Sequence, residues 1–295
     1  MFTNYSKLKK YLIFAILVGP AVLLRFSTSL YPIFRTIYLS FFDHNLMEQV
    51  HRYIGLNNYT SLLNDQTIID VIGFTLAFIT ISVILQLVLG MVVANLLNTK
   101  FIGRKIVRTL NLLPWVIPVI VSGYVFRWML NADYGLITDW VFRLSGKEVQ
   151  FLIDSFLARG SLILLNVWRN TPFMAIVLLA GLQSIPEELY EAAKIDGANW
   201  FQRFLNITLP ASSSTIVTLG LFNIIWQIAN IDIILGLTQG GPGSSTTVIA
   251  YRIYQLGMQW FNWGRASALS VYLLLIVAVI SLIALYLYRK FEFTS

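Results

Sequence analysis

Cysteine is absent from this chain of 295 residues, and histidine occurs only at His44 and His51. Without cysteine the chain has no disulfides, thiolate metal sites or cysteine nucleophiles, and two histidines alone do not complete a zinc site. Charge is also scarce, at 12% of the residues, against about 25% in ordinary soluble domains. With 57% hydrophobic residues, the composition argues against a soluble globular enzyme and against a disordered protein.

The sequence contains long apolar stretches with few charged residues. A helix crosses the hydrocarbon core of a bilayer, about 30 Å thick, with about 20 mostly apolar residues. Six stretches meet this requirement, at residues 11–32, 71–97, 110–130, 161–182, 216–237 and 266–288. The first is too long and continuous for a secretory signal peptide and lacks a small-residue cleavage site. The sequence therefore predicts an all-α, polytopic membrane protein with six transmembrane helices.

Lysine and arginine indicate the orientation of these spans, because cytoplasmic loops carry an excess of them. One set of connections holds eleven: Lys7, Lys9, Lys10, Lys100, Arg104, Lys105, Arg108, Lys194, Arg203, Arg289 and Lys290. The opposite set holds Arg52, Arg143, Lys147 and Arg252, with Arg159 and Arg265 at span edges. Both termini are therefore predicted to face the cytoplasm. The net charge of +7 is interpreted as a topology signal and not as nucleic-acid binding.

The strongest local signal lies in the cytoplasmic loop at residues 184–210. Ser184 and Glu187 have the spacing of a capping box, and we expect a short helix to run from there to about Ile195. Gly197 suits the left-handed position that follows a helix end, where a side chain is penalised.

A second short helix is predicted over residues 199–206, where Trp200, Phe201 and Phe204 form an apolar cluster. Such a cluster on an aqueous loop indicates a contact with another protein. The alternative is that these aromatic rings enter the lipid interface, where tryptophan is common. The residues alone leave both interpretations open.

The same loop resembles the EAA loop of ABC-importer permease subunits. The matching residues are Glu191, Ala192, Ala193, Asp196, Gly197 and Ala198, followed by Ile207, Thr208, Leu209 and Pro210. The resemblance implies that this loop is the coupling helix, held in a cleft of a cytoplasmic ATP-hydrolysing subunit. Trp200, Phe201 and Phe204 are assigned to the same ATPase-coupling surface.

Other motifs resemble the sugar branch of that family, the maltose-type, binding-protein-dependent permeases. They are Leu-Thr-Gln-Gly-Gly-Pro at 237–242, Asn-Thr-Pro-Phe-Met at 170–174, Gly-Leu-Asn-Asn-Tyr at 55–59 and Leu-Pro-Trp at 113–115. The resemblance runs from about residue 11 to 290. It implies the type I (MetI-like) permease fold in the inner (plasma) membrane of a prokaryote, with a sugar or oligosaccharide as substrate. The implied partners are a second homologous permease in a heterodimer, two cytoplasmic ATP-binding subunits and an extracytoplasmic solute-binding protein.

Concentrative uptake needs an energy source, and this chain lacks a Walker A loop. That loop requires a glycine-rich turn followed by lysine, which together hold the phosphates. The nearest glycine-rich run, at residues 240–246, has no lysine and is interpreted as a tight turn. We therefore expect no cofactor and no enzymatic activity in this chain, and we assign ATP hydrolysis to a partner.

Several polar side chains are predicted at membrane depth. Asn223, Gln227 and Asn230 follow the spacing i, i+4, i+7 and would share one helix face, while Gln86 lies near the middle of the second span. One interpretation is that these amides hydrogen-bond between helices. The other is that they line a path for a sugar, with Trp226 offering a flat apolar surface to its ring.

The resemblance to maltose-type permeases favours the second interpretation. Counting between Pro210 and Gly240, and back from Glu191, assigns six residues to substrate-lining positions: Asn170, Phe173, Asn223, Trp226, Gln227 and Asn230. Trp226 and Gln227 stand where the maltose permease has phenylalanine and asparagine, which leaves the sugar unidentified.

Arg169, near mid-depth of the fourth predicted span, and Asp232, on the fifth, are ionisable groups of the kind that usually face a cavity or a partner. Arg25 and Arg127 lie nearer the outer edge, where they can reach water. Arg169 has three interpretations: it neutralises Asp232, it holds a helix-end carbonyl, or it meets an anionic substrate. An ion-gradient-driven secondary transporter is the alternative function for the chain. Such transporters show inverted repeats and intramembrane carboxylates, for which Asp232 is the one serious candidate.

Three regions are expected along the chain. Residues 1–69 hold an N-terminal cytoplasmic tail, the first transmembrane helix and an outer loop. Residues 70–290 form a five-helix permease core that contains the 184–210 loop, and residues 291–295 are a C-terminal tail.

Overall fold

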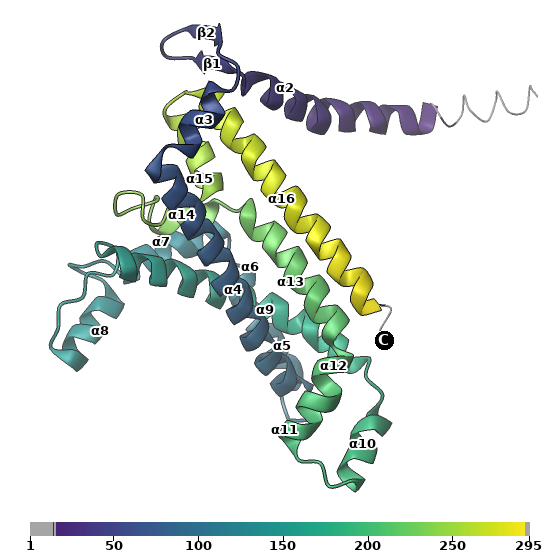
Figure 1. Cartoon of the computed structure of the whole chain (residues 1–295). Helices are drawn as coiled ribbons and strands as arrows, with labels where there is room; N and C mark the ends of the chain where they lie inside the picture. Colours follow the sequence, from purple (N-terminus) through teal and green to yellow (C-terminus); the bar gives the residue numbers. More distant parts are fainter. Residues whose placement is uncertain (1–13, 15, 293–295) are drawn as a thin grey trace, which may run out of the picture. The chain divides into compact units, whose positions relative to one another are not determined.

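The computed structural model describes residue 14 and residues 16–292 (Figure 1). The whole predicted N-terminal tail, residues 11–13 and 15 of the first predicted span, and the last three residues of the predicted C-terminal tail lie outside the described residues. The chain divides into two compact units. One comprises Met1–Asn64 and Ile253–Tyr272, and the other comprises Asp65–Arg252 and Leu273–Ser295.

Helices make up most of the described chain. In chain order, the elements that follow the first helical stretch are η1 (Phe26–Leu30), α2 (Tyr31–Leu39), β1 (Phe42–Asn45), β2 (Val50–Tyr53), α3 (Asn57–Leu63), α4 (Gln66–Asn98), α5 (Arg104–Asn111), α6 (Leu113–Val116), α7 (Val119–Met129), α8 (Leu136–Ser145), α9 (Ser155–Gln183), α10 (Glu187–Ile195), α11 (Trp200–Arg203), η2 (Phe204–Thr208), α12 (Leu209–Ala211), α13 (Ser213–Ile228), α14 (Asp232–Leu237), α15 (Ile249–Tyr254), η3 (Gln255–Gln259) and α16 (Trp263–Glu292). The elements labelled η are π-helical turns.

Four helical stretches are long and apolar enough to cross a membrane: Ile16–Leu39, α4, α9 and Trp263–Ile283 within α16. Two more candidates are bent pairs, Arg104–Val116 with Val119–Met129 and Trp200–Ala211 with Ser213–Ile228. If each bent pair crosses once, the described residues provide the six spans that the sequence predicts.

Helices α4 and α9 form the centre of the larger unit. Each begins with an aspartate cap: the side chain of Asp65 accepts from the Thr67 backbone N–H at 3.0 Å, and that of Asp154 accepts from Leu157 at 2.8 Å. The two helices pack closely at Gly90, where an added Cβ would lie 2.9 Å from the Cβ of Met174. Buried residues of α4, α9 and α13 continue this core: Met91, Ala94, Leu97, Leu178, Leu179, Leu182 and Leu219.

The span predicted at residues 110–130 is not one continuous helix, because it is broken between α6 and α7. Ile117 has an extended backbone with ψ 133°, and the helical segments on either side differ in direction by 85°. The cause is Pro118, since the proline ring excludes helical geometry from the residue before it.

The predicted span at 216–237 is also not a single helix. Helix α13 ends at Ile228, and α14 begins at Asp232 after a short break. The side chain of Asn230 lies in this break and accepts from the Asp232 backbone N–H at 3.1 Å. The spacing predicted that Asn230 shares a helix face with Asn223 and Gln227. This prediction is wrong, because Asn230 lies after the end of α13. The Asn230 side chain binds the Asp232 N–H, a donor that a continuous helix would pair with a preceding backbone carbonyl. This local bond therefore competes with continuation of the helix.

Helices α7 and α14 approach each other at two glycines. A Cβ added to Gly123 would lie 2.8 Å from the Cα of Gly236, and one added to Gly236 would lie 2.8 Å from the carbonyl oxygen of Ile120. Small residues permit such backbone contact between membrane helices.

In the smaller unit, β1 and β2 form an antiparallel hairpin after α2 (Figure 1). Its register pairs Phe42 with Tyr53 and His44 with His51. Helix α3 holds the hairpin through Asn58, whose buried side-chain amide donates to the carbonyls of Ser40 and Phe42, both at 2.9 Å.

Candidate functional site

The 184–210 loop folds largely as the sequence predicts. Helix α10 ends at Ile195, and Gly197 follows with a left-handed φ of 81°. The Ala198 N–H donates to the Ala193 carbonyl at 2.9 Å, which satisfies an otherwise unpaired carbonyl of the helix end. Helix α11 begins with a capping box formed by Asn199 and Gln202.

Two local predictions for this loop are wrong. The residue that caps α10 is Pro186, and the Ser184 hydroxyl instead donates to the Gly181 carbonyl at 2.8 Å at the end of α9. The helix expected over 199–206 is α-helical only to Arg203 and continues as the π-helical turn η2.

The tip of the loop is its most accessible part. Glu191, Ala192 and Asp196 are exposed, and Ile195 is 86% exposed. Sequence reasoning did not single out Ile195 as an exposed residue, because an apolar residue in an amphipathic helix is usually assigned to the core. The signal that was available is its position between Lys194 and Asp196, directly before the turn.

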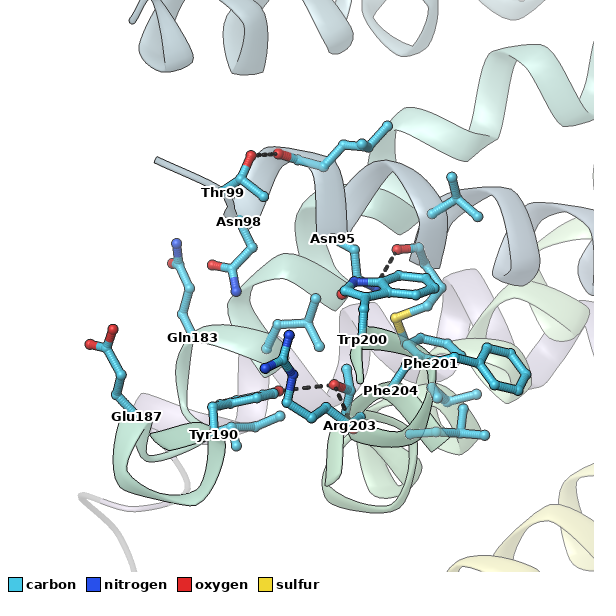
Figure 2. Close-up of a pocket in the computed structure, with 18 of the residues that line it drawn as sticks. Asn95, Asn98, Thr99, Gln183, Glu187, Tyr190, Trp200, Phe201, Arg203 and Phe204 are labelled. Atoms are coloured by element: carbon cyan, nitrogen blue, oxygen red, sulfur yellow. Dashed lines mark hydrogen bonds between the residues drawn. The ribbon is translucent and has the colours of Figure 1, made fainter. Parts of the chain in front are cut away.

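The aromatic side chains of the loop lie on the side toward α4. Trp200, Phe201 and Phe204 line a cavity of about 1140 Å³ together with residues from the C-terminal half of α4 (Figure 2). The rings of Trp200 and Phe204 stack with centroids 5.7 Å apart. These rings therefore form one wall of a groove at this end of the larger unit.

A set of hydrogen bonds ties the ends of α4, α5 and α9 together above this groove. The Leu97 carbonyl accepts from Arg104 Nε at 2.7 Å and from Arg108 Nη2 at 3.1 Å. The Gln183 side-chain amide faces the same two guanidinium groups, and in the orientation that places its oxygen toward them it accepts from Arg104 at 3.1 Å and from Arg108 at 2.9 Å. Cations at the carbonyl end of α4 also compensate its helix dipole.

Helix α10 is joined to the segment that follows it. The hydroxyls of Tyr190 and Thr208 lie 3.0 Å apart in a hydrogen bond. Lys100 and Glu187 form an ion pair at 4.0 Å, but both side chains are largely exposed, so this pair adds little.

A buried cluster of five amides connects three helices: Gln86 of α4, Asn166 and Asn170 of α9, and Asn223 and Gln227 of α13. Gln86 Oε1 accepts from Asn223 Nδ2 and from Gln227 Nε2, and Gln86 Nε2 donates to the Asn166 carbonyl at 3.1 Å. Asn166 donates to Gln227, and Asn170 donates to Asn166 Oδ1 at 2.7 Å. The geometry thus supports the interhelical interpretation for these amides, and it adds Asn166, which sequence reasoning missed.

Arg169 holds the broken span in place. Its Nη2 donates to the carbonyls of Trp115 at 3.2 Å and Ile117 at 3.3 Å, and its Nη1 donates to Asn170 Oδ1 at 3.1 Å. Of the three interpretations, the geometry supports the helix-end carbonyl. The ion pairs within 4.0 Å among the described residues do not include one between Arg169 and Asp232.

The remaining predicted pathway residues are more accessible than the amides. Trp226 is 59% exposed and stacks on Phe222, with ring centroids 5.9 Å apart. Phe173 stacks on Trp115 at 5.2 Å. The exposed residues of α13 recur at helical spacing and form one face, which the residue after the helix, Ala229, continues: Ser214, Thr218, Phe222, Ile225 and Trp226.

The glycine-rich run near residue 240 is a compact turn, as predicted. Gly240 has φ 84°, and its carbonyl accepts from the buried Thr247 hydroxyl at 3.2 Å. The Thr246 hydroxyl lies within hydrogen-bond distance of the Gly241 carbonyl oxygen (2.8 Å) and of the Thr238 hydroxyl (2.7 Å), and its one proton serves one of these contacts at a time.

Comparison with known proteins decides the family. Residues 86–293 match the family model described as the binding-protein-dependent transport system inner membrane component. The chain belongs to this family. As an ABC permease it is a multi-pass component of the inner membrane, and the ATPase activity of the importer lies in other subunits. The resemblance to ABC-importer permeases, the polytopic permease fold and the permease function predicted from the sequence are confirmed. The fold is mostly helical and not all-α, because β1 and β2 form a hairpin.

Relatives of this permease carry sugar-transport names. It is 34% identical over 270 residues to the sulfoquinovosyl glycerol transport system permease protein SmoG of Agrobacterium fabrum, which covers 91% of this chain and 88% of the relative. It is 38% identical over 239 residues to the trehalose/maltose transport system permease protein MalF of Thermococcus litoralis, covering 80% and 79%. A chain of a bacterial ABC transporter that imports the acidic polysaccharide alginate superposes with a TM-score of 0.83 at 25% identity, covering 98% and 99%.

Proposed function

We propose that this permease forms half of the translocation pathway of an ATP-driven importer for a sugar or oligosaccharide. The similar proteins named for sulfoquinovosyl glycerol, for trehalose and maltose, and for alginate support a carbohydrate substrate. The exposed α13 face with its stacked Phe222 and Trp226 supplies an apolar surface against which a sugar ring could pack. Asn230 follows this face at the helix break and offers an amide to a hydroxyl.

The proposed complex has a second homologous permease, two cytoplasmic ATP-binding subunits and an extracytoplasmic solute-binding protein. The alginate transporter has been solved in complex with a periplasmic protein that carries an alginate pentasaccharide. In this arrangement both termini and the 184–210 loop are cytoplasmic, as the distribution of basic residues indicates. The regions at 1–69 (tail, first span and outer loop), 70–290 (permease core) and 291–295 (tail) stay a prediction, and the two compact units divide the chain differently, with Ile253–Tyr272 grouped with the N-terminal part.

The observation that supports the mechanism is that the tip of the 184–210 loop is exposed, while hydrogen bonds fix the helix ends next to the loop. Glu191, Ala192, Asp196 and Ile195 are accessible to an ATPase subunit. We assign to this docking surface the motif residues Ala193, Gly197 and Ala198 as well, while Trp200, Phe201 and Phe204 support it from the groove.

Movement of the tip of the 184–210 loop would reach the spans through contacts of α9 with α5 and with the end of α6. Helix α10 follows α9 directly, and Gln183 at the end of α9 binds Arg104 and Arg108 of α5. Helix α5 leads into α6, whose terminal carbonyls are bound by Arg169 of α9. A displacement of the loop is thereby transmitted to the broken span beside Phe173. The buried amides Asn170, Asn223 and Gln227 are proposed to keep the helices that line the pathway in register.

Replacing Gly197 by valine tests the docking role. A valine at this left-handed position costs about 1–2 kcal/mol in backbone strain, but its Cβ meets no atom of this chain within 4 Å. Gly146 at the end of α8 is a matched control, since it has φ 68° and also nothing within 4 Å. We expect Gly197→Val to abolish ATP-dependent sugar uptake in vesicles that hold the complete transporter, and Gly146→Val to preserve it.

Membrane insertion of both variants is checked by their yield in the purified complex. Equal uptake by the two variants would contradict docking at Gly197. Uptake that follows a proton or sodium gradient and continues without ATP would instead establish the secondary-transporter alternative.

A further inference from the structure

The groove between α4 and the aromatic residues of the 184–210 loop is apolar at one end and polar at the other, as a lipid molecule is. Along α4 its lining changes from the exposed apolar side chains of Val88 and Val92, through Asn95 and Asn98, to Lys100 beyond the helix end. At 1.5 Å per residue, the helical part of this wall from residue 87 to 98 is about 17 Å long. The apolar half lies within a candidate membrane span, and the polar half lies at its end.

The polar end of the groove is cationic. Lys100, Arg104, Lys194 and Arg203 line it, and Glu187, the acidic residue among its lining groups, forms the exposed 4.0 Å ion pair with Lys100, so three of the four cations have no ion pair among the described residues. Arg203 is half-buried, and its guanidinium forms no hydrogen bond or ion pair with any residue that the structure describes. Figure 2 shows this side chain reaching into the cavity beside Tyr190. A partly buried cation without a partner favours binding of an anion.

We propose that this groove binds an anionic phospholipid. One acyl chain lies along Val88 and Val92, and the phosphate meets Arg203 with Lys100 or Lys194. Basic pockets between transmembrane helices at the membrane surface bind anionic headgroups in this way. A water-soluble protein could reach the cationic end but not the apolar wall at membrane depth, and an apolar helix of a second permease would leave Arg203 unpaired.

This site goes beyond the transport function, and it links that function to membrane composition. The lipid would pack between α4 and the aromatic wall formed by Trp200, Phe201 and Phe204, whose chain segment carries the exposed tip at its other end. Filling the groove would fix the distance between this wall and α4. An anionic lipid is therefore expected to restrict movement of the 184–210 loop.

Retention of defined lipids by the full-length permease tests the site. The protein is equilibrated with equal amounts of phosphatidylglycerol and phosphatidylcholine in detergent, and retained lipids are counted by native mass spectrometry. We expect preferential retention of phosphatidylglycerol. Arg203→Gln should lower it about fivefold, since a basic residue at the membrane surface contributes about 1 kcal/mol. Arg203→Lys should keep most of it.

Lys105→Gln is the matched control, because Lys105 is an exposed cation of α5 next to Arg104 but does not line the groove. We expect this variant to retain phosphatidylglycerol as the wild type does. An equal loss in Lys105→Gln and Arg203→Gln would mean that only general surface charge attracts the lipid, which would overturn the site.

A second pair of variants tests the apolar wall. Val92 is 53% exposed in the groove and Leu164 is 65% exposed on α9 outside it, so tryptophan fits at both positions. Val92→Trp should displace the retained phosphatidylglycerol, and Leu164→Trp should not. Retention that is indifferent to Val92→Trp, or no preference over phosphatidylcholine in the wild type, would refute the proposal. These outcomes do not depend on transport activity.

Discussion

The contact between α7 and α14 makes a quantitative prediction about stability. An alanine at position 123 would place its Cβ 2.8 Å from the Cα of Gly236 and 2.9 Å from its carbonyl carbon, whereas carbon atoms pack best at about 3.5–4.0 Å. The helices must separate by most of an ångström or tolerate the overlap. Overpacking of this kind costs about 1–3 kcal/mol.

Gly160 of α9 provides the reference for this substitution. It is helical like Gly123, but an added Cβ meets nothing within 4 Å. Gly160→Ala should therefore stabilise the protein by about 0.5–1 kcal/mol through helix propensity alone. Gly123→Ala gains the same propensity term, so the difference between the two variants isolates the contact. Thermal unfolding of the detergent-solubilised protein should place Gly123→Ala below Gly160→Ala by about 1–3 kcal/mol.

A double variant sharpens the test. Gly123→Ala and Gly236→Ala disturb one contact, so their combined cost should be smaller than the sum of the single costs. If Gly123→Ala unfolds at the same temperature as Gly160→Ala, or if the two glycine variants are additive, the close approach of α7 and α14 is not present in the folded protein.

The remaining predictions concern the amide cluster and the exposed α13 face. Gln86→Leu removes the oxygen that accepts from both Asn223 and Gln227 inside the protein. We expect the free energy of unfolding to fall by about 1–3 kcal/mol, measured by thermal unfolding. An unchanged midpoint would show that the cluster contributes nothing to stability. Trp226→Ala should leave stability unchanged because the side chain is 59% exposed. It should raise the KM for uptake about threefold to tenfold by removing a ring contact of about 0.5–1.5 kcal/mol, and unchanged uptake kinetics would remove Trp226 from the pathway.

The approximate positions of the candidate spans could be predicted because span length and hydropathy are local properties of the sequence. The breaks could not be placed by hydropathy, since Ile117 and Ala229 lie in segments as apolar as their neighbours. Pro118 gave a local signal for the first break. The second depends on Asn230, whose side chain competes with the helix for a backbone N–H, and periodicity does not register that competition.

The turn at Gly197 and the end of α10 were predictable because glycine in a left-handed position has a sequence signature. The partners of Arg169 and Gln86 were not, because they lie far away in the chain: the Trp115 carbonyl for Arg169, and Asn223 and Gln227 for Gln86. A spacing rule places residues on one face of a helix, but it does not say whether that face meets a pathway or a neighbouring helix.

The attachment of the broken span has a consequence for how specificity can diverge. Arg169 donates hydrogen bonds to the backbone carbonyl oxygens of Trp115 and Ile117, and every amino acid has such an oxygen. The 41%-exposed ring of Trp115, stacked on Phe173, can consequently be exchanged for another side chain while the anchor stays intact. In the proposed pathway, the side chains next to Phe173 can therefore differ between permeases with different substrates, while the main-chain attachment of the broken span is kept.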